Sequence, residues 1–311
     1  MLQLVSVRPE IERAVELIQR KDHKSLDEAF ALLQGTVYSF SMKVCGQRED
    51  AEDTMQEVLL KSVPNLPKFD NPRALMVWLY KVAKSRCLMS RRRSKFAPKQ
   101  SLSLEELMPD RKDLRQLSGS PDGTPETAFL RRESAKRLRE AVQKLPPEYR
   151  LILVLHDMEE LGDTDIAEIT GLRLGTIRVR LHRARLFVRK ELAKRDGRPV
   201  RHEPPKRLAE TQVSAPPHRA QCKEMFAQLS NYLDEELDDS LCAELEKHLD
   251  SCQPCKAFLT SLERSIEHCR TAPNQSPDRN VAAQLRRELM AEYQAVMSKV
   301  ASRGGSQFAR N

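Results

Sequence analysis

Residues 145–192 read LPPEYRLILVLHDMEELGDTDIAEITGLRLGTIRVRLHRARLFVRKEL, and this stretch decides the fold. Two helical patterns, 165–170 and 174–190, flank a turn at Gly171, a residue that adopts a positive φ at low cost. The second pattern gathers apolar residues on one face of a helical wheel. These residues are Ile177, Leu181, Ala184 and Val188. The stretch therefore predicts a helix-turn-helix.

The opposite face of the second helix is basic. From Arg173 to Lys190 there are seven Lys or Arg residues and no carboxylate. An ordinary amphipathic surface helix is the alternative, but solvated charged faces tend to mix both signs. The pattern is typical of a recognition helix that lies in a DNA major groove. On the wheel this face carries Arg178, Val179, His182 and Arg185, with Arg183 near its edge.

Length and composition set wider limits. The 311 residues leave room for two or three small domains, and a formal charge of +8 favours a polyanionic partner. No apolar run is long enough to span a membrane, and no signal peptide is recognisable, so a cytoplasmic protein is expected. Seven cysteines without an export signal predict thiols or metal ligands rather than disulfides. Without an alternating strand pattern, an all-helical chain is the simplest prediction.

The N-terminal part predicts a helical domain. Apolar residues recur at helical spacing, and Gly46, Pro64 and Pro67 act as breaks, with a loop over 64–71. From Trp78 to Lys95 there are seven basic residues and no acid. Such a helix can grip a nucleic-acid backbone, although the helix dipole also favours cations at its end. The expected helices cover residues 9–22, 25–45, 46–63 and 72–93.

The C-terminal part carries a metal-ligand pattern. Cys222 to Asp250 contains nine acids and two lysines, a net charge of −7. His248 and Cys252 are four residues apart and share a helical face, while Cys252 and Cys255 have the spacing of a zinc knuckle. Cys222 is the best fourth ligand and His218 the alternative; incidental cysteines remain the competing interpretation. Cys242 is expected to be a core thiol, and His268 and Cys269 to be incidental.

Two separated blocks resemble bacterial sigma factors. DAEDTMQEVLLK and WLYKVAKSRCLMSRRRSK resemble region two, and residues 145–185 resemble region four. The absence of a domain between them points to the extracytoplasmic-function type. The resemblance covers about residues 25–195, with one departure at Asp163-Thr164-Asp165, where Ser or Thr with Glu is usual.

This resemblance implies partners and roles. Region two would dock on core RNA polymerase, and the loop around 65–71 with the next helix would capture the −10 element as a single strand. Region four would read the −35 element of promoter DNA. The residues implied are Asp53, Gln56 and Glu57 for polymerase, Arg91, Arg92 and Arg93 for opened DNA, and Arg173, Thr176, Arg178, Val179, His182 and Arg183 for the −35 duplex.

NYLDEEL and HLDSCQPC, with Cys222 upstream, resemble the zinc-binding anti-sigma domain. The resemblance implies that Zn²⁺ is held by Cys222, His248, Cys252 and Cys255. Glu235 stands where that family usually has glycine. A C-terminal helix over 281–300 has large residues every four positions, which favours packing on the zinc domain. Those residues are Leu285, Leu289, Tyr293 and Met297.

The sequence thus predicts an all-α sigma factor with a fused zinc domain and no catalytic activity. Its rivals are a helix-turn-helix regulator independent of polymerase and a zinc enzyme, but a four-ligand site leaves no open position for water. The acidic zinc domain could contact the sigma domains and either inhibit or support them. The expected division is a region-two domain at 1–95, a linker at 96–127 with a helical turn at 104–107, region four at 128–195, a linker at 196–217, the zinc domain at 218–270, and a helix and tail at 271–311.

Overall fold

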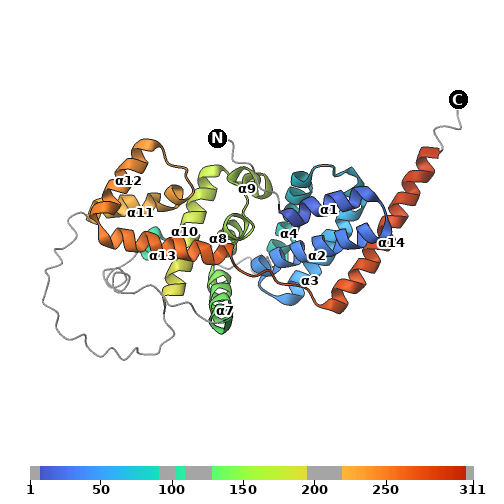
Figure 1. Cartoon of the computed structure of the whole chain (residues 1–311), viewed down its shortest axis with the longest axis horizontal. Helices are drawn as coiled ribbons and strands as arrows, with labels where there is room; N and C mark the ends of the chain where they lie inside the picture. Colours follow the sequence, from blue (N-terminus) through green and yellow to red (C-terminus); the bar gives the residue numbers. More distant parts are fainter. Residues whose placement is uncertain (1–7, 91–101, 109–127, 195–218, 306–311) are drawn as a thin grey trace. The chain divides into compact units, whose positions relative to one another are not determined.

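The computed structural model describes residues 8–90, 102–108, 128–194 and 219–305. Every regular element in those ranges is a helix (Figure 1), which confirms the expected fold class. The helices divide into two compact units, and each unit has buried residues of its own.

The first unit combines the N-terminal helices with the helices around the glycine turn and the C-terminal helix. Asp22 caps the N-terminus of α2, which begins at His23, because its Oδ1 accepts a hydrogen bond from the Ser25 amide at 2.9 Å. Gly171 ends another helix with a φ of 74°, as predicted. The elements are α1 (Pro9–Arg20), α2 (His23–Cys45), α3 (Arg48–Ser62), the 3-10 helix η1 (Val63–Lys68), α4 (Pro72–Ser90), α8 (Pro147–Leu153), the π-helical turn η3 (Val154–Met158), α9 (Asp163–Thr170) and α14 (Arg279–Gly305).

The second unit surrounds one apolar core. Leu186, Phe226 and Phe258 meet there, and the two phenyl rings pack edge to face with centroids 4.7 Å apart. Leu107 is buried in the same core, so the helical turn expected at 104–107 is confirmed and has a packing reason. The elements are α5 (Leu104–Leu107), α7 (Ala128–Lys144), α10 (Leu174–Ala193) from Arg178 onward, α11 (Arg219–Leu233), α12 (Asp239–Ser251) and α13 (Gln253–Arg270).

The loop expected over 64–71 is partly wrong. Val63–Lys68 forms η1, which begins with Pro64 in its first turn and contains Pro67. A proline lacks only its own N–H, and a short 3-10 segment loses little from that. Leu66 is fully buried, so packing holds the segment in place.

Two cysteines contradict the expectation of thiols or metal ligands. Cys45 ends α2 and Cys87 lies in α4, and the two form a disulfide. Their Cα atoms are 5.4 Å apart, within the usual range for a disulfide, because α2 and α4 pack against each other. The disulfide is a long-range feature that the residue spacing did not predict.

The C-terminal helix α14 does not pack on the zinc domain as expected. It lies against α2, α3 and η1 of the first unit. Tyr293 meets the ring of Phe30 edge-on at 6.3 Å, and Gln34 donates to the carbonyl of Ala282 at 3.0 Å. The apolar face of α14 was recognised correctly, but its partner is the N-terminal helical domain.

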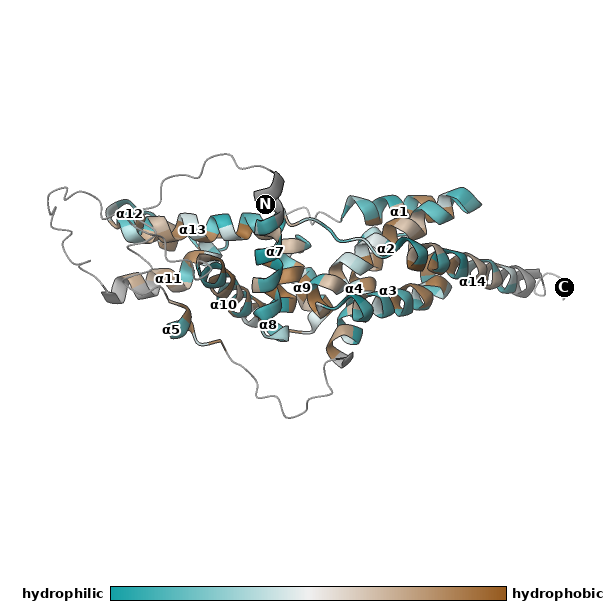
Figure 2. Ribbon diagram, turned by 90° about the horizontal axis from the view of Figure 1, so that it is seen from below, coloured by the Kyte–Doolittle hydropathy of each residue, from teal (hydrophilic) through white to brown (hydrophobic). Residues whose placement is uncertain are grey.

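No helix in the described ranges is both long and apolar enough to cross a bilayer. Figure 2 shows hydrophilic and hydrophobic residues interspersed along the helices of both units. This pattern is typical of amphipathic helices that bury one face.

Replacing Leu289 by alanine tests the docking of α14. Leu289 is fully buried against the first unit, so the substitution should lower the free energy of unfolding by about 2–5 kcal/mol. Urea denaturation monitored by circular dichroism measures the change. The control is Glu292→Ala on the exposed side of the same helix, which should change stability by less than ~0.5 kcal/mol. Equal effects of the two substitutions would contradict the docking.

Candidate metal centre and nucleic-acid interface

Four side chains of the second unit converge on one point. Cys222 comes from α11, His248 from α12, Cys252 from the junction of α12 and α13, and Cys255 from the first turn of α13. Their ligand atoms all lie within 4.8 Å of one another. Among the described residues this is the one group of His, Cys, Asp or Glu that could hold a metal ion, and it contains the four residues expected from the sequence.

The spacing of these atoms fits a tetrahedral zinc site. Zn–S bonds of about 2.3 Å place two sulfurs ~3.8 Å apart in a regular tetrahedron. The Sγ atoms of Cys222 and Cys255 are 3.7 Å apart, and those of Cys252 and Cys255 are 3.3 Å apart. His248 Nε2 lies 3.7 Å from the Cys222 sulfur and 3.2 Å from the Cys255 sulfur. The donor set and its compactness therefore suit zinc.

The other cysteines of this region lie outside the cluster. Cys242 is half-buried, and its Sγ lies 4.0 Å from the carbonyl of Leu237, so the expected core thiol is at the edge of the domain. Cys269 is buried in α13, and His268 beside it is exposed. Neither belongs to the group of four.

Part of the basic face of α10 is covered by the turn between α11 and α12. Arg185 Nη1 and Nη2 donate to the two carboxylate oxygens of Asp234 at 2.7 and 2.9 Å, a bidentate pair. Arg178 Nε lies 2.8 Å from Glu236 Oε2. Between the two acids Glu235 adopts a φ of 56°, the left-handed conformation that glycine adopts more easily. This backbone turn carries both carboxylates to α10.

His182 is also held by this domain. Its Nδ1 lies 2.9 Å from Ser230 Oγ, and the side chain is buried. Burial and the nearby Arg185 and Arg183 lower the pKa of His182 to about 4, so the ring is neutral at pH 7. About two turns after His182, the Arg189 guanidinium sits over the Phe258 ring at 4.0 Å from its centroid, a cation–π contact.

The remaining predicted DNA contacts are more open. Val179 is 50% exposed. Arg173 is exposed, and Thr176 and Arg183 are half-buried. Of the predicted set, Arg178 and His182 therefore contact the zinc-cluster domain, whereas Arg173 and Val179 are exposed.

The predicted polymerase-binding residues lie along α3. Asp53 and Gln56 are exposed, and Glu57 is half-buried between Lys61 at 2.6 Å and Arg86 at 2.8 Å. The Lys61 ammonium and the Arg86 guanidinium lower the pKa of Glu57, so it remains a carboxylate. Gln56 Nε2 lies 3.5 Å from Glu288 Oε2 of α14, which brings the C-terminal helix beside this surface. Arg91, Arg92 and Arg93 lie outside the described residues.

Sequence reasoning missed three residues of this interface. Ser230, Asp234 and Glu236 contact α10, but nothing in their spacing marks them as partners of particular cations. The net charge of −7 over 222–250 was the available signal. It indicated that the surface is acidic, but not which acid contacts which cation of α10.

Comparison with known families agrees with this arrangement. Residues 29–96 match Sigma-70 region 2, and residues 135–188 match Sigma-70 region 4. Residues 222–256 match a zinc-finger family and span all four residues of the cluster.

Curated relatives cover the sigma part of the chain. The ECF RNA polymerase sigma factor SigW of Bacillus subtilis is 26% identical over 182 residues, which is 58% of this chain and 96% of that protein. The RNA polymerase sigma-H factor of Pseudomonas aeruginosa is 28% identical over 187 residues, 58% of this chain and 93% of that protein. SigE of Mycolicibacterium smegmatis is 30% identical over 171 residues, 55% of this chain and 62% of that protein. The chain therefore belongs to the sigma factors of the sigma-70 family, of the extracytoplasmic-function type, and carries a zinc-finger domain fused behind region 4.

Proposed function

We propose that this sigma factor directs core RNA polymerase to specific promoters and that its zinc-finger domain restrains α10, the helix expected to read the −35 element. The observation that carries the proposal is the bidentate pair between Arg185 and Asp234, in which Arg185 is almost fully buried. A duplex cannot reach a guanidinium that is already enclosed by the chain's own carboxylate. The domain must therefore move before α10 presents this side of its basic face.

Because the chain belongs to the sigma factors, the two alternative functions, a polymerase-independent regulator and a zinc enzyme, fit it less well. A helix-turn-helix regulator independent of polymerase has no use for region 2, which matches over 29–96. Sigma factors are initiation factors rather than enzymes, and the four-ligand cluster would leave bound zinc without an open position for a substrate. Asp53, Gln56 and Glu57 are proposed to contact polymerase, and Arg173, Thr176, Arg178, Val179, His182 and Arg183 to contact the −35 duplex.

Zinc is the cofactor that the cluster supports. Cys222, His248, Cys252 and Cys255 would hold it and so join α11, α12 and α13. A bound zinc ion supplies a structural cross-link worth several kcal/mol of folding free energy. The cluster lies in the same domain as the Asp234 turn, so loss of the metal should loosen the contacts to α10.

The first prediction concerns the metal. The purified chain should contain one equivalent of zinc, and Cys252→Ser should lose most of it because one of the four ligands disappears. Metal analysis by mass spectrometry after gel filtration measures the content. Cys242→Ser is the matched control, since Cys242 lies outside the cluster and should leave the content unchanged. A folded, zinc-free wild-type chain would refute the prediction.

A fused domain could also support activity, for instance by keeping the sigma regions in register. Transcription in vitro with core polymerase separates the two possibilities. Templates with a randomised upstream region avoid the need for a known promoter, and RNA sequencing reports the products. A chain that lacks residues 219–270 but keeps α14, which packs on the first unit, should produce more transcripts than the full chain if the zinc-finger domain inhibits, and fewer if it supports.

A point variant tests the contact itself. Asp234→Asn with Glu236→Gln removes both charges that face α10 and should raise transcription by several-fold, because breaking a buried ion pair on one side costs about 3–5 kcal/mol. Asp239→Asn with Glu244→Gln removes the same charge from exposed positions of α12 and serves as the control. If both pairs of substitutions give the same activity, net charge alone is responsible and the proposed restraint is wrong.

A further inference from the structure

The basic face of α4 is in contact with acids of region 4. In the first unit, Arg73 Nη2 lies 2.5 Å from Asp165 Oδ1 and 3.1 Å from Glu168 Oε2. Lys81 Nζ lies 3.5 Å from the other oxygen of Glu168. Lys84 Nζ donates to the carbonyl of Ile169 at 2.7 Å. Three cations of α4 therefore have partners on α9.

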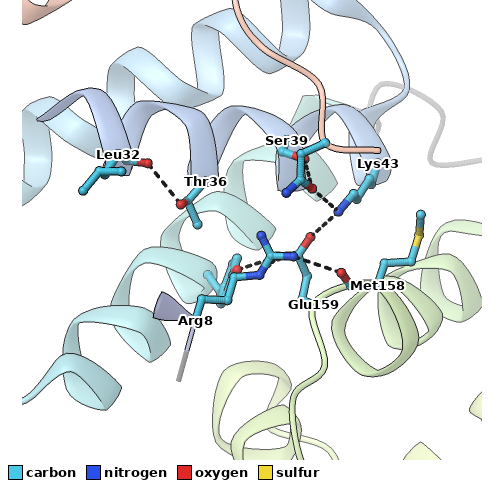
Figure 3. Close-up of polar contacts among 9 residues, drawn as sticks. Arg8, Leu32, Thr36, Ser39, Lys43, Met158 and Glu159 are labelled. Carbon is cyan, nitrogen blue, oxygen red and sulfur yellow. Dashed lines mark hydrogen bonds and ion pairs between the residues drawn. The ribbon is translucent and has the colours of Figure 1, made fainter. Parts of the chain in front are cut away.

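A buried carboxylate fixes this arrangement. Glu159, directly after η3, has a side chain with no solvent exposure. It accepts hydrogen bonds from Lys43 Nζ of α2 at 2.8 Å and from Tyr80 Oη of α4 at 2.7 Å. Arg8, which precedes α1, lies 3.1 Å away through Nε and donates from Nη2 to the carbonyl of Met158 (Figure 3). Three segments of the N-terminal domain thus share one carboxylate of region 4.

A second buried contact lies nearby. Arg150 of α8 is almost fully buried, and its Nη1 donates to the carbonyl of Val44 near the end of α2 at 3.0 Å. A buried charge is stable only when it is paired or well hydrogen-bonded, so neither Glu159 nor Arg150 suits a region 4 that is separated from region 2. The two residues are therefore suited to a closed state of the chain.

We propose that α9 acts as an internal substitute for nucleic acid on α4, held there by Glu159. Asp165 and Glu168 occupy cations that would otherwise meet the phosphates of a single strand. This restraint lies within the first unit and uses no residue of the zinc-finger domain, so it is separate from the restraint on α10. It rests on the proposed function in one respect, that α4 is the helix that meets opened DNA.

The restraint on α4 is reversible, because a nucleic-acid strand can compete with the exposed ion pairs that contribute to it. The pairs of Glu168 with Arg73 and Lys81 join side chains that are each more than 40% exposed, so these pairs are weak and screened by salt, whereas Asp165 is fully buried. A strand with closely spaced phosphates can compete for them through counterion release. Glu159 is fully enclosed, and its contacts must break as a set. The exposed pairs determine how readily DNA can displace α9 from the cations of α4. The buried contacts of Glu159 determine how far α9 can move away from α4.

The test measures binding of a short fluorescein-labelled single-stranded DNA of random sequence to the full chain by anisotropy. Asp165→Asn with Glu168→Gln should tighten binding by roughly threefold to tenfold, because the variant removes the two exposed pairs of Glu168 and the pair of Arg73 with the buried Asp165. Glu168→Gln alone, at an exposed position, should give a smaller gain and remains informative if the double variant does not fold. Adding Arg73→Ala and Lys81→Ala to the double variant should abolish the gain.

The matched control is Glu12→Gln with Glu244→Gln, which removes the same charge from exposed residues of α1 and α12. If it tightens binding as much as the α9 variants do, α4 is not occupied and the proposal is overturned. A gain that survives the loss of Arg73 and Lys81 also overturns it, because the strand then binds elsewhere. No polymerase takes part in this binding assay. Failure of the transcription experiment would therefore refute the sigma function without changing the interpretation of the single-strand binding data.

Discussion

A carboxylate without access to water is the constraint around which the first unit is built. Glu159 has zero side-chain exposure, and an ionised carboxylate in that position requires compensating donors. Lys43, Tyr80 and Arg8 supply them, and burial together with Glu159 raises the pKa of Tyr80, which keeps its hydroxyl protonated as a donor. Lys43 also donates to Asn274, just before α14. Glu159 and its partner Lys43 thus link α2, α4, the end of η3 and the segment that leads into α14.

The second unit has an equivalent centre with different chemistry. Four candidate ligand atoms from α11, α12 and α13 lie within 4.8 Å of one another, and the turn between α11 and α12 positions Asp234 and Glu236. Glu235 makes this turn in a conformation that costs an ordinary residue about 1 kcal/mol or more. The domain retains it although the strain is unfavourable locally, which is expected where neighbouring contacts determine the backbone. The contacts of Glu236 with Arg178 and of Asp234 with Arg185 can hold the backbone of Glu235 in this conformation.

Local features of the fold could be predicted from the sequence, and long-range ones could not. Gly171, Pro72 and the turn at 104–107 follow from backbone preferences and short periodicities, and the structure confirms them. The four zinc-ligand candidates were found because His248, Cys252 and Cys255 are neighbours in the sequence. The disulfide joins residues 42 positions apart, and no local pattern marks it. The apolar face of α14 was recognised, but an apolar face does not reveal which surface it will cover.

Electrostatics explains why a basic sigma factor contains so acidic a domain. Two helices expected to meet DNA, α4 and α10, each have two cations paired with carboxylates of the same chain: Arg73 and Lys81 on α4, and Arg178 and Arg185 on α10. The pairs of Glu168 with Arg73 and Lys81 are half-exposed, whereas Arg185 and Asp234 are almost enclosed. Under the two proposals above, nucleic acid would compete with the exposed set, and the enclosed set would require the zinc-finger domain itself to move or unfold. A signal to α10 would then act on the cluster of Cys222, His248, Cys252 and Cys255. The proposals thus assign different physical conditions to the two helices, ionic strength to α4 and the integrity of a metal site to α10.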